Sequence, residues 1–178
     1  IYNRSSCAVV LLWYGKPRLA LRAMQSIADH CEAETPHVFC YDNGSEPAHS
    51  EIVRKAFPRF NHFRGEQNTG FAGGFNKSLQ SVFEKGFDSV LFLTSDTEIT
   101  PGALSLCLES AHEHQADMIA PQIRFRRPSS PLDAWGGSFN PETCLLSHYR
   151  SEPQPSRLQP PWDYIPGTAL WMTRSSFY

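Results

Sequence analysis

The fold class is decided by the stretch Ser89-Val90-Leu91-Phe92-Leu93-Thr94-Ser95-Asp96-Thr97. Its apolar run, followed by a Pro-Gly helix start at positions 101 and 102, predicts a central strand of an α/β sheet. Ligands of such sheets collect at the carboxyl ends of the strands. Asp96 therefore stands where hard oxygen ligands could hold a divalent cation and, through it, the phosphates of a substrate. The alternative is that Asp96 only caps the following turn.

A second stretch, Asn68-Thr69-Gly70-Phe71-Ala72-Gly73-Gly74-Phe75-Asn76, places three glycines at the start of a predicted helix. Glycine lets the backbone approach a ligand closely, and a helix N-terminus favours an anion such as a phosphate. The alternative is that Gly73 and Gly74 only give clearance for packing the helix on the sheet. The spacing matches neither a dinucleotide-binding fingerprint nor a P-loop.

A third stretch, Val38-Phe39-Cys40-Tyr41-Asp42-Asn43-Gly44-Ser45, ends another predicted strand in a polar turn. Asp42 could accept a hydrogen bond from the N–H of a pyrimidine base. Asn43-Gly44 supplies the positive φ that such a turn needs, and Ser45 could cap the next helix. Turn and capping chemistry alone would also explain every residue of this stretch.

The rest of the chain predicts an alternation of strands and helices. Strands are expected over residues 7–14, 37–42, 61–64 and 89–94, and helices over 17–31, 47–57, 71–85 and 101–114. This alternation predicts a doubly wound, Rossmann-like, mostly parallel sheet with helices on both faces. After residue 121 the apolar runs shorten, so a small mixed sheet is expected in the C-terminal half. Residues 151–161 contain four prolines and predict an exposed loop.

Composition narrows the classes of partner. The formal net charge of −2, without a basic stripe, argues against nucleic acid as a partner. The five cysteines are odd in number and widely spaced, which favours a reducing, cytoplasmic location over a disulfide framework or a zinc site. No apolar run approaches the roughly 20 residues that span a bilayer. The basic cluster Arg124, Arg126 and Arg127 indicates a solvated hairpin edge, with peripheral contact at the inner face of a membrane as the alternative.

Taken together, the three stretches resemble the inverting family 2 glycosyltransferases of the GT-A fold, in particular the bacterial rhamnosyltransferase-like branch that builds cell-surface polysaccharides. The order and spacing of the elements carry the resemblance, since any one of them is common. It also includes the aromatic strand end at Trp13-Tyr14-Gly15 and two later glycine segments, Trp135-Gly136-Gly137 and Pro166-Gly167-Thr168. The match covers nearly the whole chain, from Cys7 to Phe177.

The resemblance implies transfer of a hexosyl or deoxyhexosyl group from a UDP- or dTDP-sugar to a hydroxyl of a saccharide or lipid-linked saccharide. It implies a Mg²⁺ or Mn²⁺ ion at Asp96 and a single domain, with a nucleotide-binding half at about 1–100 and an acceptor half at about 101–178. The nucleotide sugar is expected to contact Tyr14, Asp42, Asn43, Asn68, Gly73, Gly74, Asn76, Ser95 and Asp96. The acceptor is expected to contact Trp135, Gly136, Gly137, Gly167 and Thr168.

The sequence departs from the family pattern at the catalytic base. In the family, the strand corresponding to residues 169–172 is followed, after a short helix, by an acidic Glu-Asp pair that holds the base. We therefore expect the base beyond Tyr178, with Asp133 and Asp163 as the candidates inside the chain, and we expect apolar surface near Trp171 to be exposed. Thr94 stands where the family usually carries Asp or Asn, which predicts a weaker metal site.

Two other classes of function stay open at this point. A nucleotidyltransferase would need a basic glycine-rich loop after the first strand, and residues 13–18 supply the basic side chains without the glycines. A non-catalytic module that binds sugar nucleotides or carbohydrates is favoured by the missing base and by Thr94.

Overall fold

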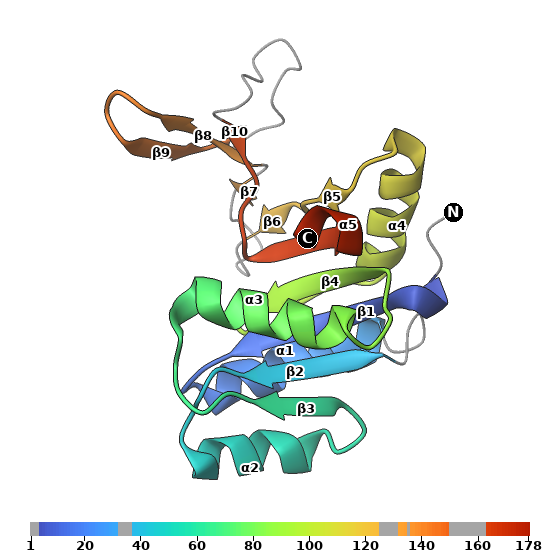
Figure 1. The fold of residues 1–178 in the computed structure, drawn as a ribbon, viewed down its shortest axis with the longest axis vertical. Helices are drawn as coiled ribbons and strands as arrows, with labels where there is room; N and C mark the ends of the chain where they lie inside the picture. Colours follow the sequence, from blue (N-terminus) through green and yellow to red (C-terminus); the bar gives the residue numbers. More distant parts are fainter. Residues whose placement is uncertain (1–3, 32–36, 125–131, 135, 150–162) are drawn as a thin grey trace.

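The computed structural model of the chain describes residues 4–31, 37–124, 132–134, 136–149 and 163–178. Its centre is a six-stranded sheet in the order β3-β2-β1-β4-β11-β5 (Figure 1). Four strands run parallel: β1 (Cys7–Trp13), β2 (Val38–Asp42), β3 (Asn61–Arg64) and β4 (Ser89–Thr94). The sheet is therefore mostly parallel, as the sequence predicts.

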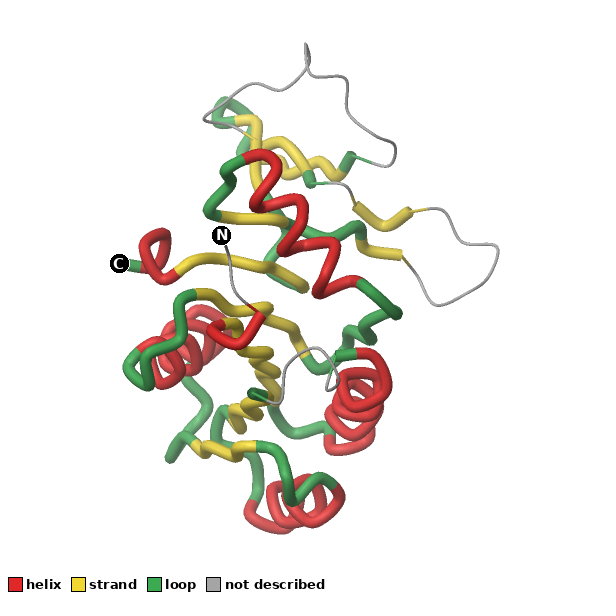
Figure 2. Tube along the Cα trace, turned by 90° about the vertical axis from the view of Figure 1, so that its right-hand side faces the viewer, coloured by secondary structure: helices red, strands yellow, loops and turns green. Residues whose placement is uncertain are grey.

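Helices cover both faces of this sheet (Figure 2). One face packs on α1 (Pro17–His30), α2 (Pro47–Ala56) and α4 (Ala103–His114). The other face packs on α3 (Gly70–Phe83) and the short α5 (Arg174–Phe177). A short 3-10 turn, η1 (Arg4–Ser6), precedes β1.

Strand β1 contributes to the hydrophobic cores on both faces of the sheet. All seven of its residues are buried, and alternate side chains enter the two cores on opposite faces of the sheet. Such a strand gains stability on both faces, at roughly 25 cal/mol for each Å² of apolar surface removed from water. It therefore takes a central position, and its carboxyl end points to the edge where ligands collect.

The C-terminal half returns to the main sheet before the chain ends. Strand β11 (Ala169–Thr173) lies antiparallel between β4 and β5 (Met118–Ile119). All five residues of β11 are buried, because the strand has neighbours on both edges and packed side chains on both faces. Trp171 itself is fully buried, whereas Met118 on the neighbouring strand β5 is 39% exposed, so the apolar surface expected near Trp171 lies beside this residue rather than on it.

Two small sheets complete the described part of the C-terminal half. One has the order β10 (Asp163–Tyr164), β8 (Gly137–Asn140) and β9 (Leu145–His148), and the other pairs β6 (Ile123–Arg124) with β7 (Leu132–Ala134). Their pairings are antiparallel, whereas the sequence predicted a mixed sheet. The proline-rich segment 151–161 lies outside the described residues, as do Arg126 and Arg127.

The predicted bounds of the first eight elements agree with the structure to within two residues. One difference has a clear cause: the helix predicted from Pro101 begins at Ala103, because Gly102 has φ of 75° and cannot join the helix. Four of the cysteines are buried, and burial raises the pKa of Cys107 to about 11. Across the described segments, none of the helices is long and apolar enough to cross a bilayer.

Candidate functional site

A cavity of about 610 Å³ lies at the carboxyl ends of β1 and β4. It brings together the loops that follow β1, β2, β3 and β4 and the segment that precedes β11. Seven of the predicted site residues line it, namely Tyr14, Asn43, Asn68, Ser95, Asp96, Gly167 and Thr168. The cavity therefore unites residues that are up to 154 positions apart in the sequence.

Asp96 stands in an open position on the wall of this cavity. Its side chain is exposed, and its Oδ1 accepts a hydrogen bond of 2.5 Å from the Thr94 hydroxyl. The N–H of Ile99, one of those that a capping Asp96 would accept, donates instead to the Ser26 hydroxyl at 3.0 Å. The carboxylate of Asp96 thus keeps oxygen lone pairs that face solvent and the cavity.

Asn43 is buried and organises two of the loops around the cavity. Its Nδ2 donates to Asn68 Oδ1 at 3.0 Å and to the Gly70 carbonyl at 2.9 Å. Its Oδ1 accepts from the N–H and the hydroxyl of Thr69, at 3.3 and 3.0 Å. These four bonds use the full capacity of an amide side chain, so Asn43 supports the shape of the cavity and has no bond left for a ligand.

Gly73 and Gly74 of α3 lie beneath this network and do not line the cavity. A Cβ on Gly74 would lie 2.8 Å from Asn43 Nδ2 and 2.9 Å from Leu12 Cδ1. A Cβ on Gly73 would lie 2.7 Å from the Thr69 side chain. Their geometry favours the clearance alternative, because the absent side chains make room for the residues that shape the site.

Asp42 lies next to a second cavity, of about 280 Å³, which shares Trp13 with the first. Asp42 is buried; its Oδ1 accepts from the Ser45 N–H at 2.8 Å, and its Oδ2 accepts from the Ser50 hydroxyl. Arg64 Nε lies 3.7 Å from the same Oδ2. Two partners plus a nearby guanidinium hold this carboxylate in place while leaving it acceptor capacity.

Ser45 does not cap α2 as predicted, because the N-cap position is Glu46 and no side chain caps this helix. Ser45 instead accepts a hydrogen bond of 2.9 Å from the Gly15 N–H. This bond ties the β1–α1 loop, which presents the half-exposed Tyr14 to the cavity, to the turn after β2. Gly44 adopts φ of 82°, which confirms the predicted turn.

The remaining predicted residues are spread over other parts of the molecule. Gly136 and Gly137 are buried around the small sheet, where a Cβ on Gly137 would lie 2.3 Å from the Ser147 carbonyl oxygen. Asn76 is exposed further along α3, outside the lining of the cavity. Trp135 and the side chains of Asp133 and Asp163 lie outside the described residues.

Seven further residues line the main cavity without having been predicted as site residues: Leu12, Trp13, Lys16, Leu19, Gly70, Phe71 and Thr94. Lys16 could have been found as the cation nearest to the end of the first strand. Phe71 is half exposed, and its ring would lie 3.0 Å from a Cβ on Gly167, so it closes the side of the cavity near β11. An exposed aromatic residue at a helix start was the available signal for it.

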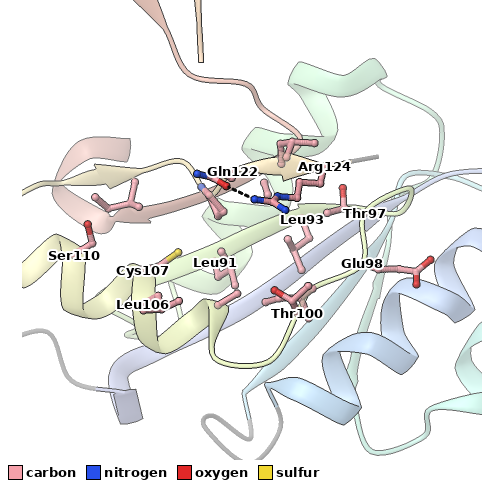
Figure 3. Close-up of a pocket in the computed structure, with 16 residues that line it drawn as sticks. Leu91, Leu93, Thr97, Glu98, Thr100, Leu106, Cys107, Ser110, Gln122 and Arg124 are labelled. Carbon is pink, nitrogen blue, oxygen red and sulfur yellow. Dashed lines mark hydrogen bonds between the residues drawn. The ribbon is translucent and has the colours of Figure 1, made fainter. Parts of the chain in front are cut away.

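The loop between β4 and α4 separates the main cavity from a larger one of about 770 Å³. Figure 3 shows this larger cavity between β4, α4 and the β5–β6 segment, with Leu91, Leu93 and Cys107 beneath it. Its lining is mostly apolar and contains none of the predicted site residues. The 610 Å³ cavity remains the candidate site, because convergent polar side chains rather than size give a pocket its specificity.

The donor atoms around Asp96 fit a hard cation in part. Within the described residues, no three His, Cys, Asp or Glu side chains come together in a way that could hold a metal ion. One exposed carboxylate and the neighbouring hydroxyl of Ser95 do line the cavity. Mg²⁺ typically uses only one or two protein carboxylates and completes its shell with water and substrate phosphates. The carboxylate of Asp96 and the hydroxyl of Ser95 are therefore ligands of a type that Mg²⁺ accepts.

Comparisons with known proteins agree with this geometry. The family model described as Glycosyl transferase family 2 matches residues 8–178. No curated protein sequence matches the chain. The S. aureus TarS 1–349 structure in complex with UDP is 19% identical with a TM-score of 0.57, over 74% of this chain and 40% of that chain. The TarS 1–349 complex with UDP-GlcNAc is 18% identical with a TM-score of 0.55, over 73% and 39%. This chain therefore spans less than half the length of these structures, and at such identity the likeness concerns the fold.

Proposed function

The chain belongs to glycosyl transferase family 2, and from this premise we propose that it moves a sugar from a nucleotide-diphosphate donor to a hydroxyl acceptor. The observation that carries the proposal is the 610 Å³ cavity, in which the exposed carboxylate of Asp96 faces polar loops from four strand ends. A nucleotide sugar needs this combination of a phosphate-side cation site and polar loops for its base and ribose.

We propose a UDP- or dTDP-sugar as the donor. The TarS structures in complex with UDP and UDP-GlcNAc support a uridine nucleotide on a fold of this kind. Asp42 would accept the N–H of the pyrimidine base, and Trp13, which lines both cavities, would lie between the base and the phosphates. Lys16 would counter part of the diphosphate charge from the β1–α1 loop.

Asp96 would hold a Mg²⁺ or Mn²⁺ ion between its carboxylate and the diphosphate, with Ser95 contributing its hydroxyl. When bound, such an ion neutralises negative charge on a leaving diphosphate. The Thr94 hydroxyl, which donates to Asp96 at 2.5 Å, fixes the direction of the carboxylate. With Thr at this position, the donor's own phosphates would complete more of the shell than in a site with two carboxylates.

The acceptor is proposed to be a saccharide or lipid-linked saccharide of a cell surface polymer, bound on the side of Gly167 and Thr168, at the cytoplasmic side of a membrane. These two residues line the cavity, and Gly167 lies next to Phe71. Transfer with inversion needs a base for the acceptor hydroxyl. By the family resemblance, this base would follow the short helix after β11, which corresponds to α5.

Calorimetry with UDP, dTDP, GDP and CMP, each with and without Mn²⁺, tests the donor. We expect the uridine or thymidine diphosphate to bind, and only with the cation. A transfer assay on this chain and on a chain extended past Tyr178 then tests the base: faster turnover by the extended chain supports its place after α5. Equal turnover would assign the base to residues within the chain, with Asp133 and Asp163 as the first to replace.

A further inference from the structure

Ser26 is a polar residue on the buried face of α1. The other buried residues of this helix are Ala20, Ala23, Met24 and Ile27, and Ser26 is 8% exposed among them. A buried hydroxyl is retained in a core only with hydrogen-bond partners. The partners of Ser26 therefore indicate what its hydroxyl does.

The hydroxyl makes one local bond and one distant bond. It donates to the Ala23 carbonyl at 2.8 Å, a bond that serine commonly makes within a helix. It also accepts from the N–H of Ile99 at 3.0 Å, 73 positions later in the chain. The second bond joins α1 to the loop between β4 and α4, and this loop carries Asp96.

The loop is fixed at both of its ends. Before Asp96, the N–H of Thr94 donates to the Thr168 carbonyl at 3.0 Å, at the end of the pairing between β4 and β11. After Asp96, the bond to Ser26 holds the backbone of Ile99, and the Ile99 side chain is buried against the core shared with α1. Between these two points the loop has no ladder of backbone bonds, since residues 95–100 form a turn and an irregular segment.

A second contact between the loop and α1 lies at the surface. Glu98 pairs with Arg22, and Figure 3 shows Glu98 extending away from the larger cavity toward α1. Both side chains are more than a third exposed, and exposed pairs of this kind contribute little. The buried bond to Ser26 is therefore the stronger of the two contacts on this side of Asp96.

We propose that Ser26 is a positioning residue for donor binding: its hydroxyl fixes the backbone of Ile99, and thereby the direction in which Asp96 enters the cavity. This proposal rests on the proposed function, because Ser26 would orient Asp96, the residue proposed to hold the cation. Without the hydroxyl, the buried N–H of Ile99 loses its partner, and the loop must shift to bring that N–H to water.

Ser26→Ala tests the proposal, and Ser78→Ala is its matched control. Ser78 is also buried in a helix and also donates to a carbonyl three residues earlier, Phe75 at 2.9 Å. Both variants lose the same local bond, whereas only Ser26→Ala frees the loop. We expect Ser26→Ala to weaken Mn²⁺-dependent UDP binding about tenfold, the scale known for residues that orient metal ligands. Ser26→Thr, which keeps the hydroxyl, should restore most of this affinity.

Calorimetry measures UDP affinity and hydrogen exchange measures the opening of the loop, and the two together test the proposal. The proposal predicts faster exchange over residues 95–100 and weaker UDP binding in Ser26→Ala, with neither change in Ser78→Ala. If Ser26→Ala does not fold, Ser26→Cys, with a weak sulfur acceptor, should show an intermediate loss. Unchanged UDP affinity in a folded Ser26→Ala would overturn the proposal and leave the proposed function standing, provided that Asp96→Ala binds weakly. Unchanged affinity in Asp96→Ala would overturn both.

Discussion

Asp42 and Asp96 occupy similar places in the sequence, because each comes at the carboxyl end of an apolar run. In the structure, however, the two carboxylates differ in burial and in hydrogen-bond partners. Asp42 is 3% exposed and accepts from Ser45 and Ser50, with Arg64 at 3.7 Å. Asp96 is exposed and accepts from Thr94. A buried carboxylate with several partners holds its own turn together, whereas an exposed one with a single partner among the described residues can bind a cation. The number of partners thus separates two sites that the sequence pattern makes look alike.

The largest effect should follow from Asp96→Ala. The variant should lose Mn²⁺-dependent affinity for UDP on the order of 100-fold, since a contact between a cation and a carboxylate is worth a few kcal/mol at an effective dielectric near 20. Thermal stability should hardly change, because an exposed side chain with one hydrogen bond is removed. Calorimetry and a melting curve measure the two properties. Unchanged affinity would remove Asp96 from the site.

The next effect concerns the turn that Asp42 and Asn43 share. Asn43→Ala removes the four hydrogen bonds by which this buried amide holds Asn68, Thr69 and Gly70. We expect a loss of about 2 to 4 kcal/mol in the free energy of unfolding. Asn76→Ala, at an exposed position of α3, is the control and should stay within about 0.5 kcal/mol of the parent. Equal stability of both variants would contradict the role given to Asn43.

Asp42→Asn should act on base preference more than on stability. An amide keeps an acceptor for Ser45 and the shape of the side chain, and the Arg64 contact that it weakens involves a guanidinium exposed on the surface. The free energy of unfolding should change by less than about 1 kcal/mol. The preference for UDP over CMP should relax, because an acceptor becomes a mixed donor and acceptor. Early unfolding with an intact preference would make Asp42 a structural residue only.

The smallest effect is expected for Thr94→Val, which keeps the size of the side chain and removes the hydroxyl that directs Asp96. UDP affinity in the presence of Mn²⁺ should fall a few-fold, in line with the roughly 1 kcal/mol that one hydrogen bond contributes. Titration calorimetry at two Mn²⁺ concentrations measures it. A loss as large as that of Asp96→Ala would show that Thr94 itself binds the cation or the donor.

The strands and the strand-end turns were predictable from the sequence, because apolar runs and turn residues act over a few positions. Asp96 could be read from the sequence in two ways. The bond from the Ile99 N–H to Ser26, which argues against capping, is visible only in three dimensions. The role of Asn43 could not be predicted, since its amide partners lie 25 to 27 positions away. Ser26 carries no motif at all, and its partner lies on a loop from another part of the chain.

The C-terminal half was less predictable for a different physical reason. Gly167 and Thr168 reach the cavity only because β11 enters the sheet beside β4. A run such as Ala169–Thr173 indicates a strand but not its neighbours, since any buried strand has the same apolar pattern. The family resemblance predicted that these two residues contact the acceptor, and the structure adds that they line the same cavity as Asp96.

The position of β11 also determines the order in which the sheet can be assembled during synthesis. Strands β1 to β4 are complete once residue 94 has left the ribosome, whereas the neighbour that covers the free edge of β4 comes 75 residues later. Contacts between such distant segments form slowly, and an uncovered apolar edge pairs readily with other chains. Nascent chains that pause between residues 94 and 169 should therefore be the species that aggregate and that chaperones retain.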